Sequence, residues 1–230
     1  MLIESNKLRP YLHTKIFKYS TDEYPFKEIL ENLFGTELGN LHKTLGDFKK
    51  FEVKNNISTD QSTLAHKVFY SNFSRTLEPL YKKFIKEVII PILNPHKFYY
   101  QQIPTFRVGL PENTFVGEFH KDSFYNHQNY EINFNLGLAN YIGDAALKTQ
   151  LKPGSEEYFM LECPYGSIFS FDHIDCLHGA EPNPLGKTMV SFDFRLALQD
   201  LYYKSNNRSI NQGKGFNRGE YFSQELAHNL

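Results

Sequence analysis

The sequence lacks tryptophan altogether, and its 230 residues include only two cysteines, Cys163 and Cys176. Two cysteines do not make the disulfide framework of a small secreted domain, so we expect free thiols and a reducing, cytoplasmic setting. No apolar run is long enough to cross a bilayer, and the first residues show no signal peptide. We therefore expect no membrane partner.

Neither sign of charge is in excess. The 25 basic and 26 acidic residues give a net charge of −1, and the sequence pI is about 6.8. Proteins that bind nucleic acid usually show a basic surplus or a basic stripe, so this balance argues against nucleic acid as a partner. The expected partner is a small-molecule substrate. The charge balance does not indicate whether the protein is a monomer or an oligomer.

Aromatic residues, by contrast, are plentiful. Phenylalanine and tyrosine make up 16% of the chain, and such residues favour β-strands and line small-molecule pockets. The length suits one domain with a substantial core. We expect this domain to span residues 1–203, with a helical part at 1–96 packed on a sheet, a β-rich core at 97–203 and a C-terminal tail at 204–230.

The first part of the chain shows helical periodicity. Residues 1–20 indicate an irregular lead-in with a short strand near 13–19, and a helix is predicted to start near Pro25. The longest amphipathic stretch, 60–93, repeats apolar residues every three or four positions, with Pro79 as a kink. We interpret its apolar face as packing on a sheet. The alternative is a partner-binding helix in a non-enzymatic interaction protein.

From residue 97 the pattern changes to short strands that are separated by proline- and glycine-containing turns. Strands are predicted at 98–102, 105–108, 115–120, 131–138, 158–163, 167–171 and 188–198. The sequence shows no βαβ alternation, no Gly-rich phosphate loop and no internal repeat. This pattern indicates a mostly β protein with flanking N-terminal helices, and its core is an antiparallel barrel or a double-sheet jelly roll.

Three residues of this β-rich part form a candidate metal site. His120 and Asp122 are two residues apart, and residues i and i+2 of an extended strand point to the same face. His178 follows 56 residues after Asp122, where a jelly roll would bring it beside the pair. Two histidines and one carboxylate on one face of a metal are typical of non-heme Fe(II) oxygenases. His120, Asp122 and His178 are therefore the predicted metal ligands and catalytic residues.

A competing set of ligands lies on one local segment. His173 and Asp175 form a second His-x-Asp pair, with His178 three residues further on. These groups would need a turn around the metal, and they would leave His120 and Asp122 without a role. Cys176 is a poor candidate, because a soft thiolate disfavours Fe(II) and O₂ chemistry of this kind.

The order of short motifs around the first set resembles a known family. The motifs are Gly117–Asp122 (GEFHKD), Glu131–Phe134 (EINF), Pro164–Ser167 (PYGS), His178-Gly179 and Ser191–Arg195 (SFDFR). They are similar to those of Fe(II)/2-oxoglutarate-dependent oxygenases, and in particular to a small bacterial branch that includes proteins of streptomycin-type antibiotic pathways. The resemblance covers residues 98–200, and EINF and SFDFR are the strings that look specific to the branch.

The resemblance implies a fold, a set of cofactors and a reaction. The fold would be a double-stranded β-helix, which is the cupin-like jelly roll. Fe(II), 2-oxoglutarate and O₂ would hydroxylate a small polar metabolite, such as an amino acid, a sugar or a natural-product intermediate, and ascorbate would stimulate the reaction. Succinate and CO₂ would be released. In halogenating members a small residue replaces the carboxylate, so Asp122 favours hydroxylation. The alternatives are a cupin-like metal-binding isomerase or sugar-binding module, and a zinc hydrolase.

A dicarboxylate cosubstrate needs a cation, which the resemblance places on the strand after His178. Lys187 lies nine residues after His178 and Arg195 lies 17 after. A regular strand would point both to one face, together with Ser191 and Asp193. Arginine is preferred because its planar fork meets a carboxylate bidentately. We favour Arg195 and keep Lys187 as its rival, and Asp193 is close enough in sequence to pair with Arg195.

Further polar residues are candidates for the pocket. Asn133 and Asn135 share one face of the predicted strand at 131–138, and they either line the site or face solvent. We assign Asn133 and Ser191 to the cosubstrate and Asn135 to the substrate. The tail at 204–230 is either frayed or packs its aromatic residues back over the site. The remaining substrate-binding candidates are Arg107, Tyr125 and His127.

Overall fold

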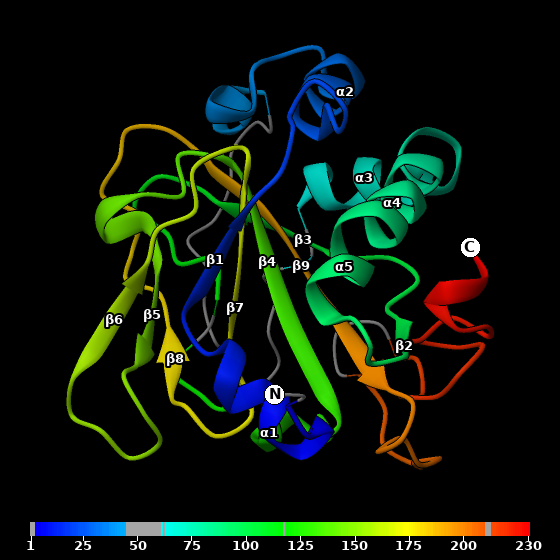
Figure 1. Cartoon of the computed structure of the whole chain (residues 1–230). Helices are drawn as coiled ribbons and strands as arrows, with labels where there is room; N and C mark the ends of the chain where they lie inside the picture. The colour runs from blue at the N-terminus through cyan, green and yellow to red at the C-terminus, as the bar shows by residue number, and fades with distance from the viewer. Residues whose placement is uncertain (1–2, 45–60, 62, 117, 210–212) are drawn as a thin grey trace.

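The strands of the protein form two antiparallel sheets (Figure 1). The computed structural model describes residues 3–44, 61, 63–116, 118–209 and 213–230. The strands are Lys15–Lys18 (β1), Phe98–Tyr100 (β2), Thr105–Gly109 (β3), Glu131–Ala139 (β4), Leu147–Gln150 (β5), Tyr158–Leu161 (β6), Ser167–Phe171 (β7), His178–Gly179 (β8) and Met189–Leu198 (β9). The larger sheet has six strands in the order β1-β7-β4-β9-β2, with β3 also paired to β9. The smaller sheet has the order β6-β5-β8.

β4 and β9 form the centre of the larger sheet. In their register Asn133 lies opposite Arg195, and Phe134 lies opposite Phe194. Because side chains alternate along a strand, one face of this pair is polar and the other is apolar. Phe134 and Phe194 stack with ring centroids 5.9 Å apart, and Phe192 joins them in the main apolar core. The apolar face packs on the helices.

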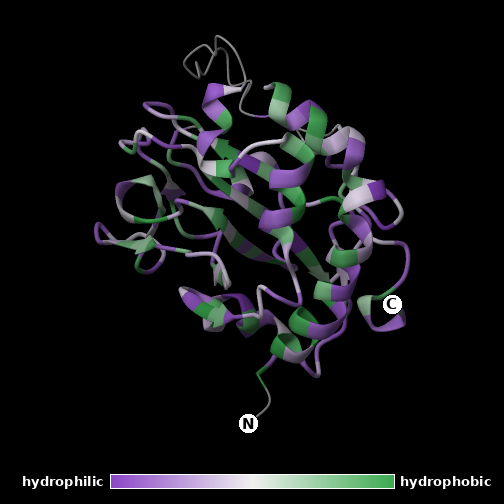
Figure 2. Cartoon of the chain, turned by 90° about the horizontal axis from the view of Figure 1, so that it is seen from above, coloured by the Kyte–Doolittle hydropathy of each residue, from purple (hydrophilic) through white to green (hydrophobic). Residues whose placement is uncertain are grey.

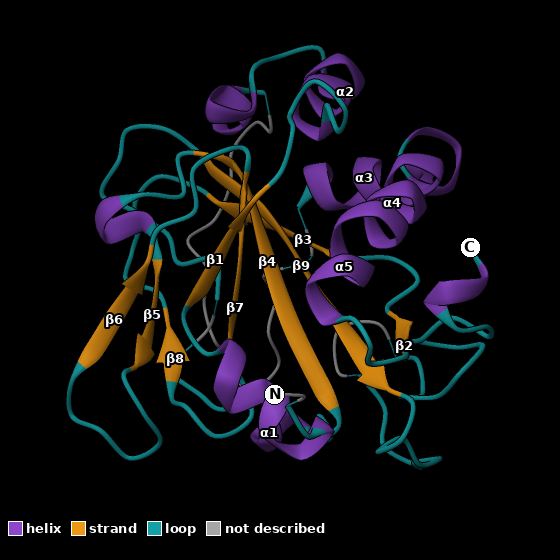
Figure 3. Cartoon of the chain, in the orientation of Figure 1, coloured by secondary structure: helices purple, strands orange, loops and turns teal. Residues whose placement is uncertain are grey.

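The helices are Ser5–Leu12 (α1), Phe26–Phe34 (α2), Leu64–Thr76 (α3), Glu78–Phe84 (α4) and Ile90–Leu93 (α5). Figure 3 shows α3, α4 and α5 on one side of the larger sheet, with β5, β6 and β8 on the other side. Seen from above and coloured by hydropathy, the helices carry both hydrophobic and hydrophilic residues along their length (Figure 2). No described helix has the length and apolar character that crossing a membrane requires.

The predicted amphipathic stretch at 60–93 is helical, but it is divided. Pro79 lies in the first turn of α4. The N–H groups of a first turn have no carbonyl partner within the helix, so proline loses no hydrogen bond there. α3 ends three residues earlier, at Thr76. A π-helical turn at Ile85–Ile89 then joins α4 to α5. The buried residues of these helices belong to the main core that includes the face of the larger sheet, which confirms the packing role predicted for the apolar stripe.

Several predicted elements differ from the structure. The irregular lead-in contains a helix, α1, because Leu8 and Leu12 lie four apart and both are buried in the core. The strand predicted at 115–120 is wrong, since its described residues 115–116 and 118–119 lie outside any strand and only His120 forms an isolated bridge. β5 and β8 were not predicted. No pairing among the described strands closes the two sheets into a barrel.

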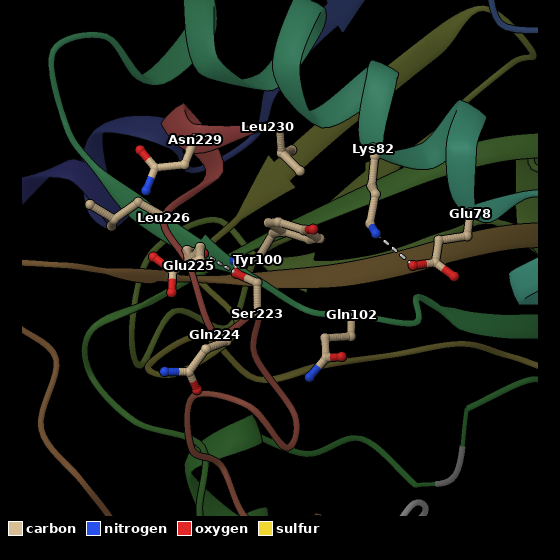
Figure 4. A pocket seen from close by; sticks show the side chains of 10 residues that line it. All are labelled: Glu78, Lys82, Tyr100, Gln102, Ser223, Gln224, Glu225, Leu226, Asn229 and Leu230. Carbon is tan, nitrogen blue, oxygen red and sulfur yellow. Dashed lines mark hydrogen bonds and ion pairs between the residues drawn. The ribbon is translucent and has the colours of Figure 1, made fainter.

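The described residues of the C-terminal segment pack against the sheet and are not frayed. Phe216, Tyr221 and Phe222 are buried and form an apolar cluster with Tyr99. Backbone hydrogen bonds dock the segment on β2 and the residues after it: Ser223 N–H donates to Tyr100 O at 2.7 Å, and Gln102 N–H donates to Tyr221 O at 3.0 Å. A hollow of about 240 Å³ remains between this segment and α4, and Figure 4 shows the side chains that line it.

Phe222→Ala should lower the free energy of unfolding by about 3–5 kcal/mol, because it removes a fully buried ring and leaves a cavity. Urea unfolding of the full chain measures the change. Leu64→Ala is the control, since Leu64 is 55% exposed, and it should change stability by no more than about 0.5 kcal/mol. A loss below about 1 kcal/mol for Phe222→Ala would contradict the packing of the C-terminal segment.

Candidate metal centre

His120, Asp122 and His178 meet between the two sheets. The Nε2 atoms of His120 and His178 lie 3.4 and 3.3 Å from Asp122 Oδ1, and one potential ligand atom from each residue falls within 4.8 Å of the others. The side chains of Asp122 and His178 are 4% and 5% exposed, whereas that of His120 is 12% exposed. The three residues that the sequence predicts as metal ligands are therefore brought together, with His120 nearest to solvent.

The backbone places the triad by a route that differs from the predicted one. His120 and His178 form an antiparallel bridge in which each N–H donates to the other residue's carbonyl at 2.9 Å. Asp122 begins a 3₁₀ turn, Asp122–Tyr125, and its N–H donates to His173 O at 2.8 Å. The argument that His120 and Asp122 share one face of a strand is therefore wrong, although the two side chains do converge.

Backbone carbonyls orient both imidazoles. Nδ1 of His120 lies 2.7 Å from Glu118 O, and Nδ1 of His178 lies 3.0 Å from Cys176 O. A carbonyl only accepts, so each Nδ1 carries the proton, and each Nε2 turns its lone pair toward Asp122. Burial lowers the pKa of His178, which keeps its ring neutral and ready to act as a ligand.

Gly179 allows Phe119 to lie against β8. A Cβ atom at Gly179 would come within 2.7 Å of Phe119 Cδ2 and 3.1 Å of Phe119 Cα. The Phe119 ring also meets Tyr158 edge-on, with ring centroids 5.5 Å apart. Because Phe119 precedes His120 and Gly179 follows His178, this contact fixes how closely the two histidine-bearing segments approach.

Gly179→Ala should weaken divalent-metal binding at the triad about tenfold, because the added methyl group pushes Phe119 aside and separates the two histidines. A titration with Co(II), followed by its visible absorption, measures the affinity. Gly186→Ala is the matched control, since a Cβ there meets no described atom within 4 Å. Unchanged Co(II) affinity in Gly179→Ala would show that this contact does not position the histidines.

The second oxygen of Asp122 is bound to Arg195. Asp122 Oδ2 accepts hydrogen bonds from Arg195 Nη2 at 2.7 Å and from Nε at 3.2 Å. Burial has the largest single effect and raises the pKa of Asp122, but the Arg195 guanidinium and the neighbouring His120 and His178 together outweigh burial and hold the pKa of this carboxyl well below its usual range. Asp122 is therefore ionised, with one oxygen turned to the histidines and the other to the arginine.

This ion pair is part of a row of alternating charges. Arg195 Nη1 also donates to Asp193 Oδ2 at 2.9 Å, and Arg107 Nε donates to Asp193 Oδ1 at 2.9 Å. The row runs from Asp122 through Arg195 and Asp193 to Arg107, across the adjacent strands β9 and β3. The pairing of Asp193 with Arg195 that the sequence allowed is thus present.

A small cavity of about 30 Å³ adjoins the triad, and its polar wall contains Arg107, Asn133, Asn135, Asp193 and Arg195. Asn133 Oδ1 and Asn135 Nδ2 are buried, and neither atom has a hydrogen-bond partner among the described residues. Buried amide groups are nearly always paired, so these two mark a place where a polar ligand is missing. Both asparagines therefore line the site and do not face solvent.

The remaining predicted residues lie elsewhere. Lys187 is exposed in the loop before β9 and is not among the described residues that line the cavity. Ser191 is buried in β9 but is likewise not part of the described lining. Tyr125 packs edge-on against His120, with ring centroids 4.9 Å apart. His127 pairs with Glu131 at 2.6 Å and is not among the described residues that line the cavity.

The apolar wall of the cavity was missed by sequence reasoning. It consists of Phe115, Val116, Leu147 and Phe171. Phe171 also meets His178 with ring centroids 4.8 Å apart, so it supports the ligand directly. Strand periodicity is the only sequence signal for such residues. It predicts which face of a strand a side chain occupies, but it does not predict which residues lie opposite that face.

The competing ligand set is not assembled. Asp175 is bound to Arg9 at 2.6 Å, away from His178. The His173 ring is fully buried, and its two nitrogens have no hydrogen-bond partner within the described part of the chain. Cys176 is buried, which raises the pKa of its thiol to about 12 and leaves it protonated.

A divalent metal fits the triad. Three acceptors converge there, namely two imidazole lone pairs and one carboxylate oxygen, and acceptors repel one another unless a cation lies between them. Bonds of about 2.1 Å from a metal to such ligands place neighbouring ligand atoms about 3 Å apart. The observed separations of 3.3 and 3.4 Å are close to this value.

Comparison with known proteins adds a sequence relative. No family model matches the chain. The streptomycin biosynthesis protein StrG of Streptomyces griseus is 28% identical over 208 residues, which cover 89% of this chain and 95% of StrG. The chain is StrG-like. This match confirms the resemblance that the motifs around His120 and His178 indicate.

Solved structures give weaker likenesses. The non-heme monooxygenase ThoJ, in its nickel complex, aligns with a TM-score of 0.43 and 11% identity, over 84% of this chain and 77% of ThoJ. AviO1 of Streptomyces viridochromogenes Tue57 aligns with a TM-score of 0.41 and 13% identity, over 86% of this chain and 96% of AviO1. Likenesses at this level carry no argument about what this chain does.

Proposed function

We propose that the protein is a non-heme iron oxygenase of natural-product biosynthesis that uses 2-oxoglutarate to hydroxylate a small polar metabolite. The observation that carries the proposal is the convergence of two imidazole Nε2 atoms and one carboxylate oxygen beside a cavity. Two histidines and one carboxylate with open positions opposite are typical of non-heme Fe(II) oxygenases. The likeness to StrG supports the assignment to natural-product biosynthesis.

The connectivity supports a jelly-roll core for this function. From β3 onward, the chain moves between the two sheets. β3, β4, β7 and β9 belong to the larger sheet, whereas the bridge at His120, β5, β6 and β8 belong to the smaller one. Two facing antiparallel sheets joined in this way make a double-sheet jelly roll. Both histidines of the triad then lie in the smaller sheet and face the polar side of the larger one.

The chain's own residues hold the metal in one orientation. His120 and His178 would bind it through Nε2, because carbonyls occupy Nδ1. Asp122 would bind it through Oδ1, because Arg195 occupies Oδ2. An iron(II) ion in this position supplies the activation of O₂ that an unactivated C–H bond requires. The apolar residues Phe115 and Phe171 line the same cavity and would exclude water from it.

The charges of the cavity favour a dianionic cosubstrate. Arg107 and Arg195 are balanced by Asp122 and Asp193, so a divalent ion would add two uncompensated positive charges. The two carboxylates of 2-oxoglutarate would neutralise them. We assign the far carboxylate to Arg195, whose guanidinium lines the cavity, and the unpaired amide of Asn133 gives a further polar contact.

The cavity must widen when the cosubstrate binds. Its volume of about 30 Å³ holds about two water molecules at about 10–15 Å³ each, which is far less than a five-carbon diacid needs. The long side chains of Arg107 and Arg195 line this space, and a rotation of either side chain would enlarge it. The proposed binding step therefore exchanges the contact between Arg195 and Asp193 for one between Arg195 and the ligand.

His120→Ala, Asp122→Ala and His178→Ala should each abolish succinate formation, because each removes one of three metal ligands. The measurement is succinate release in a metabolite screen with Fe(II), ascorbate and 2-oxoglutarate. Asp144→Ala removes an exposed carboxylate, 69% accessible, and should leave the rate unchanged. Full activity of any triad variant under saturating Fe(II) would contradict the assignment.

Arg195→Gln should raise the KM for 2-oxoglutarate by at least about 30-fold, the effect expected when one partner of a buried charged pair is lost, and it should also weaken metal binding because Asp122 loses its partner. Lys187→Gln should leave this KM unchanged, because Lys187 is exposed outside the described lining of the cavity. Initial rates at varied 2-oxoglutarate measure both. The reverse pattern, with only the Lys187 variant impaired, would transfer the carboxylate contact to Lys187.

A further inference from the structure

The turn between β7 and β8, residues 172–176, supports the metal triad through its backbone carbonyls. His173 O accepts the hydrogen bond from Asp122 N–H at 2.8 Å. Cys176 O lies 3.0 Å from His178 Nδ1 and fixes the orientation of that ring. One turn therefore positions two of the three predicted ligands, although none of its own side chains reaches the triad.

Arg9 of α1 clamps this turn. Its Nε donates to Asp172 Oδ1 at 2.7 Å, and its Nη2 donates to Asp175 Oδ2 at 2.6 Å. Its Nη1 donates to Asn129 O at 2.6 Å, in the segment that leads from Asp122 to β4. A single side chain thus joins the two segments that carry the metal ligands, across more than 100 residues of sequence.

The chemistry of this clamp requires arginine. Three of its nitrogens donate hydrogen bonds to three separate acceptors. The single ammonium group of a lysine, on its flexible stem, does not reproduce this arrangement. The side chains of Arg9 and Asp172 are only 11% and 4% exposed, so water competes weakly for them. Asp172 Oδ1 also accepts from Asp175 N–H at 3.1 Å, so the contact with Arg9 bears directly on the shape of the turn.

A second residue from the same part of the chain contacts the turn. Asp172 N–H donates to His13 Nδ1 at 3.1 Å, and His13 Nε2 lies 3.0 Å from Gln150 O at the end of β5. The N-terminal helix and the residue that follows it are thus bonded to the turn and to the smaller sheet. This places α1 behind the metal site as a support.

We propose that Arg9 is a positioning residue for the metal triad, and that α1 sets metal affinity by holding the turn at residues 172–176 against the Asp122 segment. The inference rests on the proposed metal site and not on the choice of cosubstrate. Loss of contacts that orient metal ligands lowers affinity by about 10–100-fold. Arg9 acts one contact further away, so we expect the lower end of this range.

The test is a Co(II) titration of the full-length protein, read by visible absorption, with urea unfolding in parallel. Arg9→Gln should weaken Co(II) binding about tenfold and alter the ligand-field bands, because Asp122 and His178 shift relative to each other. Arg9→Lys should recover part of the affinity. Lys7→Gln, on the same helix, is the control, since Lys7 is 71% exposed and pairs only with Glu4 among the described residues.

Wild-type Co(II) affinity and spectrum in folded Arg9→Gln would overturn the inference, even if that variant were less stable to urea. Should Arg9→Gln fail to fold, Asp175→Asn provides the same test, because Asp175 is half exposed and loses only the ion pair with Arg9; unchanged affinity there also overturns it. Co(II) binding that is lost in His178→Ala, with no succinate formed by the wild type, would reject the oxygenase proposal and leave this inference intact.

Discussion

The buried ion pair between Asp122 and Arg195 is the interaction on which the rest of the site depends. A carboxylate that is 4% exposed would gain a proton if it stood alone, and a protonated carboxyl is a poor metal ligand. Arg195, together with the two histidines, prevents this. Arg195 also occupies Oδ2, so only Oδ1 remains for the histidines and a metal. Because Asp193 and Arg107 continue the alternation of charge, no member of the row is buried without a partner.

The architecture can be understood as the means of holding this row in place. β9 contributes Arg195 and Asp193 from one face, while its other face packs Phe192 and Phe194 on the helices. The smaller sheet brings His178 opposite, and the C-terminal segment packs against the residues that follow β2. The apolar core therefore supplies the rigidity, and the polar face of the same strands supplies the chemistry.

Much of this could be predicted from the sequence, because periodicity and turn residues are local signals. The bounds of β7 agree with the predicted strand, and β9 differs by one residue. The metal triad could also be predicted, since a His-x-Asp pair followed by a later histidine is a recognisable sequence motif. The reason given for the convergence of His120 and Asp122 was wrong, because a bridge and a 3₁₀ turn replace the strand.

The contacts that escaped prediction are those between distant segments. Strand parity placed Lys187 on the face of Arg195, but β9 begins at Met189, so Lys187 lies in the loop before it. Nothing in the sequence pairs Arg195 with Asp122, which is 73 residues away. Arg9 and Asp172 are 163 residues apart in the sequence. Arg9 also lies in helix α1, in a stretch that was predicted to be irregular. The local sequence pattern predicts the faces of strands and helices and the positions of turns. Contacts between residues that are distant in the sequence follow only from the packed fold.

Anomalous diffraction at the iron edge, from crystals grown with Fe(II) under anaerobic conditions, would locate the metal and its ligand atoms. We expect a single strong peak bonded to His120 Nε2, Asp122 Oδ1 and His178 Nε2, with Asp122 Oδ2 still paired to Arg195. A peak at His173 and Asp175, or a metal bound through Asp122 Oδ2 with Arg195 displaced, would contradict this expectation.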